Sequence, residues 1–272
     1  MLNILNILKG FCIELSQSSV NILLLKGFGL SKYYPVPNHR PVGNIDIFPY
    51  GAHDKVNAII QGKGVNIENS HPKHTVFLYN GVTFENHSIY LDSYQTKAEK
   101  KVQSFLEQIE NDEQTSDGYY VPSPIKNYFF LLCHMSRHFS EYESITIRHL
   151  LDWDLFIKGE RQNLDPDFIH SKLKEFDLVM CNDIFTSLAQ DVIGVDLSAF
   201  IFNEVNQKDK DCIMADILDS KRKVFPKCTF ARIVYKMKLL MSIQWKFQYL
   251  AFSYWERIVY SILLHWEHGD KV

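Results

Sequence analysis

Hydrophobic and polar residues alternate with two different periods along this chain. Residues 2–15 place apolar side chains at spacings of three and four, which predicts an amphipathic helix. Residues 20–25 form an apolar run of strand length that ends at Lys26-Gly27, and this predicts a buried strand entering a turn. Residues 43–48 alternate polar with apolar, as a half-buried strand does.

The following segments predict a helix and a hairpin. Residues 52–62 have a helical pattern, whereas residues 74–79 and 82–90 alternate and are separated by Asn80-Gly81, a strong hairpin signal. Residues 33–38 contain two prolines and are therefore expected to form an extended loop. The first 95 or so residues are thus predicted to form a small mixed α/β unit with about four or five strands.

Beyond Lys97 the strand pattern disappears. The segments that predict helices there are 97–110, 123–139, 145–158, 165–175, 178–192, 208–219 and 229–267. The polar residues 111–118 are the predicted linker. The expected fold class is α+β, with a small N-terminal mixed β-sheet domain of residues 1–96 followed by a larger α-helical domain of residues 97–272.

Composition and charge narrow the class of protein. The chain has 29 Lys and Arg against 32 Asp and Glu, and 46% of its residues are hydrophobic, as in ordinary globular proteins. The net charge of −3 argues against long nucleic acids as partners. No uncharged run approaches the ~18 residues of a membrane span, and the N-terminus lacks signal-peptide features. Five scattered cysteines without a CxxC pair predict free thiols and a cytoplasmic location.

Three side chains with oxygen atoms are expected to converge on the predicted sheet. Asn44 and Asp46 lie two residues apart on one strand and therefore project from the same face. Glu85 lies on a later strand and offers another carboxylate. Because Mg²⁺ prefers one or two carboxylates together with substrate phosphates, this pattern predicts a magnesium site.

The turn before this strand has residues suited to phosphate. Gly27 permits close approach of the backbone to a phosphate group. Lys26 and Arg40 supply cations that pair with phosphate oxygens. The expected ligand is therefore a phosphate-bearing molecule held beside the metal.

The order of these motifs resembles a known family. The motifs are Leu25-Lys26-Gly27, a loop with Pro and Arg40, Gly43-Asn44-Ile45-Asp46-Ile47, Glu85-x-His87, Leu132-Cys133-His134, Arg137-His138 and Arg148-His149-Leu150-Leu151-Asp152-Trp153. Together they resemble the uncharacterised bacterial nucleotidyltransferase family within the DNA-polymerase-β-like superfamily. The resemblance spans residues 22–158.

This resemblance implies a reaction and its cofactor. In that superfamily a D-x-D pair and a third carboxylate hold two metal ions, Mg²⁺ or Mn²⁺, which bind a nucleoside triphosphate and activate an acceptor hydroxyl. By position, Asn44 and Asp46 are the pair and Glu85 is the third ligand, so these are the expected catalytic and metal-binding residues. The expected nucleotide-binding residues are Lys26, Gly27, Arg40 and Gly43. The acceptor, the preferred nucleotide and the oligomeric state stay open.

Two positions depart from the family pattern. Asn44 replaces an aspartate, so the site loses one negative charge, and Phe28 follows Gly27 where many superfamily members have serine. These departures support a second hypothesis. In it the chain is a catalytically weakened or inactive relative that keeps the fold to bind a nucleotide or a protein partner.

The histidines are interpreted as structural. His87 is expected to form hydrogen bonds, and His71 and His74 are expected to be solvated loop residues. His134 and His138 have the spacing of a two-ligand metal face, but no glutamate follows His134, so the HExxH signature is absent and packing is the expected role.

Other functions have less support in the sequence. The chain lacks G-x-S-x-G, which argues against a serine hydrolase of that type. It also lacks the Arg-then-His spacing that, by resemblance, helical ribonuclease partners of minimal nucleotidyltransferases use. Aromatic residues between 245 and 266 scatter around the predicted helix, which favours a buried helix over a stacking surface.

Overall fold

A computed structural model describes residues 2–41, 43–71, 73–91, 96–108, 112–142, 144–219 and 229–268. The chain divides into two compact units. The first comprises Met1–Asp92, Gln103–Phe130 and Ser261–Val272, and the second comprises Ser93–Val102 and Leu131–Tyr260. The assignment of residues 1–96 and 97–272 to two domains stays a prediction about which parts fold independently.

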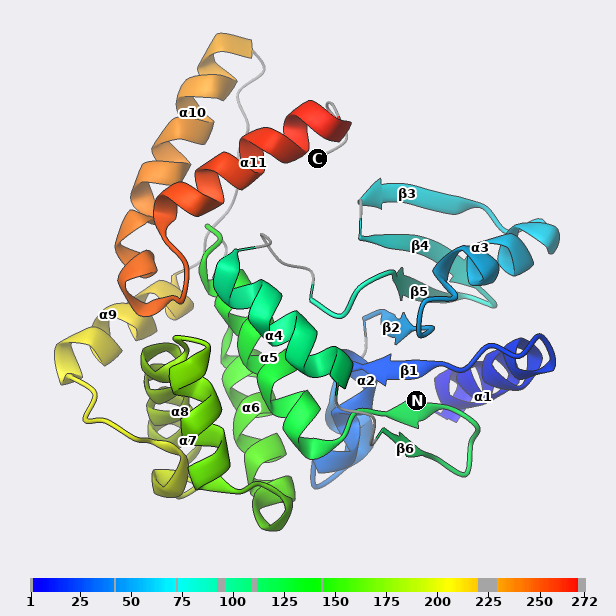
Figure 1. Ribbon diagram of the computed structural model, residues 1–272, viewed down its shortest axis with the longest axis horizontal. Coiled ribbons are helices and arrows are strands. Elements are labelled where there is room, and N and C mark those ends of the chain that lie inside the picture. The colour runs from blue at the N-terminus through cyan, green and yellow to red at the C-terminus, as the bar shows by residue number, and fades with distance from the viewer. Residues whose placement is uncertain are drawn as a thin grey trace. The chain divides into compact units, whose positions relative to one another are not determined.

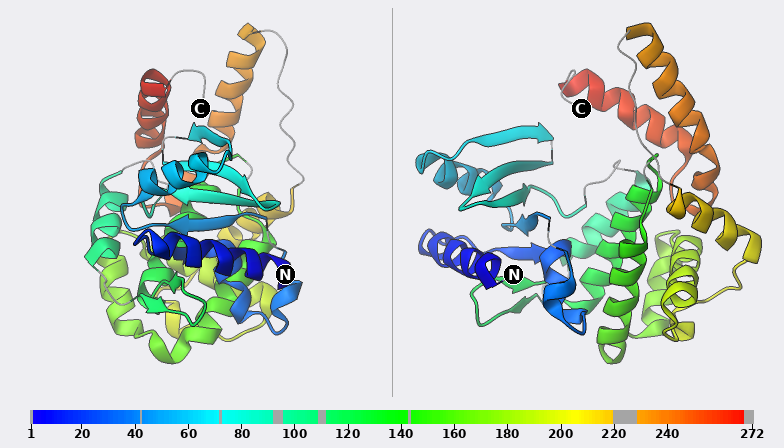
Figure 2. Two further views of the ribbon diagram at one scale, coloured as in Figure 1. Left: turned by 90° about the vertical axis from the view of Figure 1, so that its right-hand side faces the viewer. Right: turned by 180° about the vertical axis from the view of Figure 1, so that it is seen from behind.

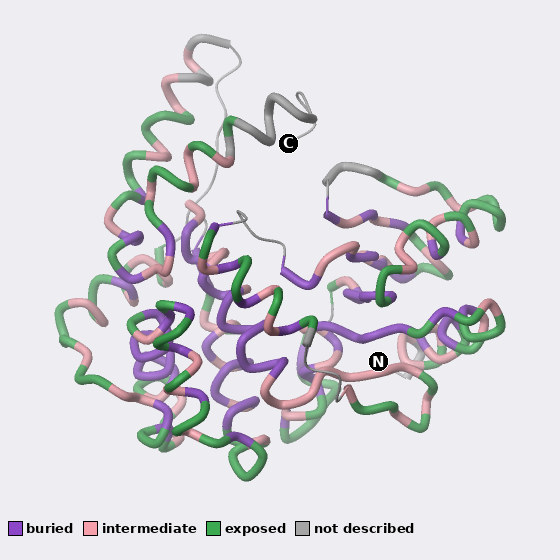
Figure 3. Tube along the Cα trace, viewed as in Figure 1, coloured by how far each residue is buried: buried purple, intermediate pink, exposed green. Residues whose placement is uncertain are grey.

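The first unit is built on a seven-stranded mixed sheet in the order β3-β4-β5-β2-β1-β7-β6 (Figure 1). Its strands are β1 Leu23–Leu25, β2 Ile45–Phe48, β3 Ile67–His71, β4 His74–Tyr79, β5 Val82–His87, β6 Glu113–Gln114 and β7 Tyr120–Val121. The β4–β5 hairpin turns at Asn80 and Gly81, both with positive φ, as the sequence predicts. Strand β1 is buried along its whole length (Figure 3).

Helices α1 Leu2–Gln17 and α3 His53–Gly62 pack beside the sheet (Figure 2). A short helical turn, α2 Lys26–Gly29, follows β1 directly. The hydrophobic core joins side chains of α1 and α3 to alternate residues of the strands; its members include Leu8, Phe11, Leu15, Ile45, Ile47, Val56, Ile60, Phe77 and Phe84. This core fixes one face of β2 and β5, so their other face can carry polar groups.

The rest of the chain is mainly helical, and the predicted α+β class is confirmed. The remaining helices are α4 Lys97–Gln108, α5 Pro124–Phe139, α6 Ile147–Glu160, α7 Pro166–Glu175, α8 Val179–Ile193, α9 Gln207–Leu218, α10 Thr229–Ser242 and α11 Tyr254–His268. Short 3₁₀ turns span Ser31–Tyr33, Pro37–His39, Arg161–Asn163, Ser198–Phe200 and Gln244–Tyr249. None of the described helices is long and apolar enough to cross a bilayer.

The interior of the second unit contains hydrogen-bonded polar residues as well as apolar ones. The Trp153 indole on α6 donates to Thr186 Oγ1 on α8 at 3.0 Å. Asp183 on α8 accepts the backbone N–H groups of Phe202 and Asn203, each at 3.0 Å. These bonds satisfy polar groups that burial would otherwise penalise.

The predicted linker at 111–118 is wrong where the structure describes it, because residues 113–114 form strand β6 and residues 115–118 lie in the turn that leads to β7. Strands β6 and β7 pair there as a hairpin, and β7 adds to β1 in parallel. Gly118, with φ +86°, allows the turn between them. Strands of two residues are too short to show alternation, which is why the sequence has no visible strand pattern beyond Lys97.

The single helix predicted over 229–267 is also wrong. Helix α10 ends at Ser242, and α11 begins at Tyr254 after the 3₁₀ turn. Ser253 and Glu256 form a reciprocal cap, since the Glu256 carboxylate accepts from Ser253 N at 2.7 Å and Ser253 Oγ accepts from Glu256 N at 3.2 Å. Trp255 is 69% exposed, although Phe247 and Phe252 are buried as predicted.

The residue Lys246 is buried in the segment between these helices. It lies in the 3₁₀ turn with no exposed surface, ion-paired to Asp216 at 2.7 Å, and it donates to Glu141 O at 3.0 Å. Such contacts join distant parts of the chain, so helical periodicity does not reveal them.

Candidate active site

The candidate site starts from the register of two central strands of the first unit. Strands β2 and β5 are parallel, and Asp46 is paired with Glu85. Residues two apart share a face, so Asn44 lies on the Asp46 side of the sheet and His87 on the Glu85 side. The opposite face of the same strands carries Ile45, Ile47 and Phe84 in the core.

Asp46 is the centre of a dense set of donors, all directed at its Oδ1 atom. Lys26 Nζ lies 3.1 Å from this oxygen, and His87 Nε2 also lies 3.1 Å from it. Asn44 Nδ2 approaches it at 3.5 Å. The contact with Nε2 requires a proton between the two atoms, so His87 donates to Asp46.

These contacts decide the ionisation of Asp46, which is only 2% exposed. Burial acts to raise its pKa, but Lys26 and the hydrogen bond from His87 outweigh burial and hold the pKa of Asp46 well below its usual range. Asp46 is therefore a permanent anion near neutral pH. A carboxylate of this kind is better suited to bind a metal ion than to accept a proton.

Glu85 and two imidazoles complete this face of the sheet. Glu85 Oε2 lies 3.7 Å from His87 Nε2, and the Glu85 side chain is 24% exposed. The ring of His74, opposite His87 on β4, lies 5.2 Å away from that of His87. Burial, followed by the neighbouring His87, lowers the pKa of His74 to about 4.

Gly27 brings the α2 turn close to the carboxylate. Its φ of +34° and ψ of −109° lie outside helical values, and Lys26 before it also has positive φ. A β-carbon at Gly27 would meet Asp46 Oδ2 at 3.3 Å and Asn44 O at 3.5 Å. The backbone conformation therefore favours glycine here, and a side chain would also crowd the Asp46 carboxylate.

The structure also shows the surroundings of three other residues that the sequence analysis named, Phe28, Arg40 and Gly43. Phe28, which replaces the serine of many superfamily members, is 6% exposed and packs in the core. Arg40 is buried, and its Nη1 donates to Pro41 O at 3.4 Å. A β-carbon at Gly43 would meet nothing within 4 Å. Phosphate binding by Arg40 and Gly43 stays a prediction.

The donor set fits a hard divalent cation. Asp46, Glu85 and His87 each offer a ligand atom, and these atoms lie within 4.8 Å of one another. Two carboxylates on adjacent strands are the oxygen ligands that Mg²⁺ and Mn²⁺ take beside substrate phosphates. Lys26 holds a cationic group against Asp46, which shows that this position accommodates positive charge.

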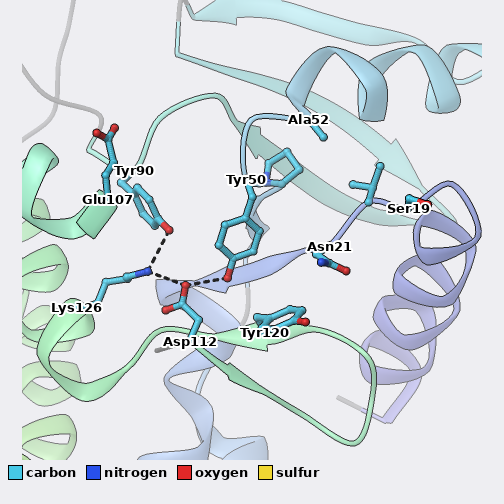
Figure 4. Close-up of a pocket in the computed structure, with 11 residues that line it drawn as sticks. Ser19, Asn21, Tyr50, Ala52, Tyr90, Glu107, Asp112, Tyr120 and Lys126 are labelled. Carbon is cyan, nitrogen blue, oxygen red and sulfur yellow. Dashed lines mark hydrogen bonds and ion pairs between the residues drawn. The ribbon is translucent and has the colours of Figure 1, made fainter. Parts of the chain in front are cut away.

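A separate cavity of about 440 Å³ lies in the first unit at the opposite ends of β1 and β2, beside Asn21 and Pro49 (Figure 4). Inside it Lys126 Nζ lies 2.6 Å from Asp112 Oδ2, and Tyr50 donates to the same oxygen at 2.8 Å. Lys126 also donates to Tyr90 at 3.2 Å. In this cavity Lys126 and Asp112 pair with each other, whereas the donors of the other site converge on the Asp46 carboxylate.

The structure therefore brings together most of the residues that the sequence singled out. Lys26, Gly27 and Asn44 surround Asp46, with Glu85 on the adjacent strand. Sequence reasoning treated His87 as structural and did not connect it to Asp46. The signal available was its position two residues after Glu85, on the same face of a strand.

Comparison with known proteins agrees with this geometry. The family model described as an uncharacterised nucleotidyltransferase matches residues 2–194, a range that contains the sheet and every residue of the site. Searches of the curated proteins and of the solved structures find no match. The match covers well over half of the chain, and the chain therefore belongs to the uncharacterised nucleotidyltransferase family.

Proposed function

We propose that the chain transfers a nucleoside monophosphate from a nucleoside triphosphate to a hydroxyl acceptor, with Mg²⁺ or Mn²⁺ at the Asp46 site. The observation that carries this proposal is the pairing of Asp46 with Glu85 beside Lys26 and Gly27. Family membership supports the reaction class. The acceptor and the identity of the ion are part of the proposal.

The charges of the site support this role. Asp46 and Glu85 contribute two negative charges and Lys26 one positive charge, so the three side chains together leave one negative charge (−2 + 1 = −1). A divalent cation reverses that sign, which favours a polyanionic triphosphate. Lys26 could then pair with phosphate oxygens in place of Asp46. Gly27, which has no side chain, would leave room for these oxygens beside the strand.

The transfer forms one bond to phosphorus and breaks one bond to phosphorus. The acceptor hydroxyl loses its proton to solvent and its oxygen bonds to the α-phosphorus. The bond from that phosphorus to the oxygen that bridges it to the β-phosphorus breaks, and pyrophosphate leaves. A bound divalent ion neutralises the charge that develops on these oxygens and lowers the pKa of the acceptor hydroxyl. Asp46 and Glu85 would hold it, Asn44 would add a neutral oxygen, and His87 positions Asp46 by its hydrogen bond.

Calorimetric titration of ATP, GTP, CTP and UTP in excess Mg²⁺ tests the proposal. We expect at least one nucleotide to bind only with the metal, and Asp46→Asn to weaken that binding by at least about tenfold, or about 1.4 kcal/mol. Asp54→Asn is the matched control, because the Asp54 side chain is fully exposed on α3. Circular dichroism confirms that each variant is folded.

Two results would contradict this assignment. One is a folded wild-type protein that binds none of the four nucleotides. The other is equal, metal-dependent affinity in wild type and Asp46→Asn, which would place the nucleotide elsewhere.

A second candidate function is nucleotide binding without turnover. Asn44 favours it, because an amide in place of a carboxylate weakens metal binding and neutralises less charge at the reacting phosphate. The buried Phe28 also removes the hydroxyl found near the triphosphate in many superfamily members. Pyrophosphate release in the presence of nucleotide and a panel of hydroxyl acceptors distinguishes the two functions.

A further inference from the structure

A cluster of three histidines lies in the second unit and shares no residue with the site assigned above. His134 and His138 are one helical turn apart on α5, and His149 lies in the first turn of α6. Each offers a ring nitrogen, and these nitrogens lie within 4.8 Å of one another. The ring centroids are 4.5 Å apart for His134 and His138 and 5.1 Å apart for His138 and His149.

We propose that His134, His138 and His149 form a binding site for a transition-metal ion, with Zn²⁺ as the expected occupant. Neutral imidazole nitrogens are preferred ligands of Zn²⁺ and neighbouring transition metals, whereas Mg²⁺ and Ca²⁺ take oxygen. The three side chains are only half-buried, so an ion can reach them. No carboxylate belongs to this group among the residues that the structure describes.

The spacing within the cluster matches the requirements of zinc. Histidines at i and i+4 of a helix present nitrogens on the same face, as in many two-histidine zinc motifs. The third nitrogen comes from another helix, so bound metal would join α5 to the start of α6. Three protein ligands leave one position of a tetrahedral ion for water or for a substrate group.

Thr146 provides the contact that orients His149. The Nδ1 atom of His149 accepts the backbone N–H of Thr146 at 3.0 Å and lies 2.9 Å from Thr146 Oγ1. In the metal-free protein the proton of neutral His149 is therefore on Nε2. A metal ion bound at Nε2 would require this proton to be on Nδ1, where Thr146 Oγ1 could accept it, and the backbone N–H of the exposed residue Thr146 would then bond to water.

This site does not depend on the proposed nucleotidyl transfer. The histidines and Asp46 belong to different compact units and share no residue. Because Asp46, Glu85 and His87 also offer metal ligands, a binding experiment must separate the two groups. The Asp46→Asn variant does so, since it removes the carboxylate at the centre of the first group.

Equilibrium dialysis of the full chain against Zn²⁺, followed by elemental analysis, measures the stoichiometry and affinity. We expect one zinc equivalent to remain in Asp46→Asn and the affinity of that site to fall by at least about tenfold in His138→Asn. Thr146→Val should weaken binding about 10-fold to 100-fold, as loss of a contact to a ligating histidine does. His170→Asn, which changes a histidine stacked on Phe202 outside the cluster, should bind as wild type does.

X-ray absorption at the zinc edge of Asp46→Asn keeps the test independent of whether the histidine variants fold. Several imidazole nitrogens at about 2.0–2.1 Å from zinc would support the site. Loss of all zinc in folded Asp46→Asn, unchanged affinity in His138→Asn, or a zinc environment without several imidazoles would overturn it.

Discussion

At the scale of single residues, the contacts of Asp46 determine its ionisation and the space beside its carboxylate. Lys26, His87 and Asn44 all approach one carboxylate oxygen. Burial acts to raise the pKa of Asp46, but Lys26 and the hydrogen bond from His87 outweigh it and keep this buried group ionised. The other oxygen faces Gly27, where a side chain would crowd it. The contacts stabilise the charge on one oxygen, while the missing side chain leaves space beside the other.

Gly27→Ala should disturb both the fold and the site. We expect the free energy of unfolding to fall by roughly 1–3 kcal/mol, because alanine is strained at this φ and ψ. We also expect metal-dependent nucleotide binding to weaken, since the new methyl group lies against Asp46 Oδ2. Denaturant unfolding and calorimetry measure the two effects.

Gly10→Ala is the control, and it is expected to change the free energy of unfolding in the opposite direction. Gly10 lies within α1, and a β-carbon there meets nothing within 4 Å. Alanine should therefore raise stability by about 0.5–1 kcal/mol. Equal effects of the two substitutions would contradict the special role of Gly27.

Asn44→Asp tests the departure from the family pattern. A second carboxylate near Asp46 should increase Mg²⁺ affinity by about tenfold, or about 1.4 kcal/mol, because attraction to the ion grows with ligand charge. Without metal the variant should be less stable than wild type, since two like charges then lie close together. The Mg²⁺ dependence of the thermal midpoint measures both effects.

Asn66→Asp makes the same charge change at an exposed position and should leave the Mg²⁺ response unchanged. If Asn44→Asp increases turnover strongly, the wild-type site is catalytically weakened. Unchanged Mg²⁺ affinity in this variant would argue against position 44 as a metal ligand.

At the scale of elements, strand β5 has one face that stabilises the fold and one face that carries residues of the candidate site. Glu85 and His87 face the candidate site, whereas Phe84 and Asn86 face the helices. Asn86 is fully buried and donates to His53 O at 3.1 Å and to Asn57 Oδ1 at 3.0 Å, which ties the strand to α3. The rigid attachment of one face holds the polar face in place.

Asn86→Ala should therefore lower stability without removing the site. Two buried hydrogen bonds are lost, so we expect a decrease of roughly 1–3 kcal/mol in the free energy of unfolding. The protein that remains folded should keep its metal-dependent nucleotide binding. Leu78→Ala on β4, 61% exposed, is a control expected to change stability by less than about 0.5 kcal/mol.

At the scale of the whole molecule, the pH dependence of stability is expected to depend on one buried acid, Asp154. Asp154 on α6 has no exposed surface, and both its carboxylate oxygens are buried without a hydrogen-bond partner among the described residues. Burial raises its pKa to about 6, although Lys158 acts in the opposite direction. The folded protein thus holds a proton that the unfolded chain has already released.

The sign of the resulting pH dependence follows from this difference. Between the ordinary pKa of 3.8 and about 6, the folded state binds the Asp154 proton and the unfolded state does not, so stability falls as pH rises. Below 3.8 this contribution is fully favourable, and above about 6 the loss is complete. Asp154→Asn should remove this dependence and be more stable than wild type at pH 8 by roughly 1–3 kcal/mol.

Denaturant unfolding of wild type and variant from pH 4 to pH 8 measures the difference directly. Asp177→Asn is the control, because Asp177 is exposed and asparagine tolerates its positive φ equally well. A stability difference between wild type and Asp154→Asn that stays constant across this range would contradict the assignment of a raised pKa.

Local patterns in the sequence predict the elements with strong periodicity and the site residues that lie on them. Alternation along residues 43–48 and the turn at Asn80-Gly81 placed β2, β4 and β5 correctly. Because side chains two apart share a face, the same alternation predicted that Asn44 and Asp46 project together. These features depend on neighbours in sequence, which periodicity records.

Contacts between residues that are distant in sequence become visible in the folded protein alone. The parallel register of β2 and β5 pairs Asp46 with Glu85 and adds His87 to the site. Packing of helices assembles His149 with the two histidines of α5, and burial of Lys246 accompanies the interruption of the C-terminal helices. Such contacts depend on strand order and core packing, and residues far apart in sequence carry no local pattern that records them.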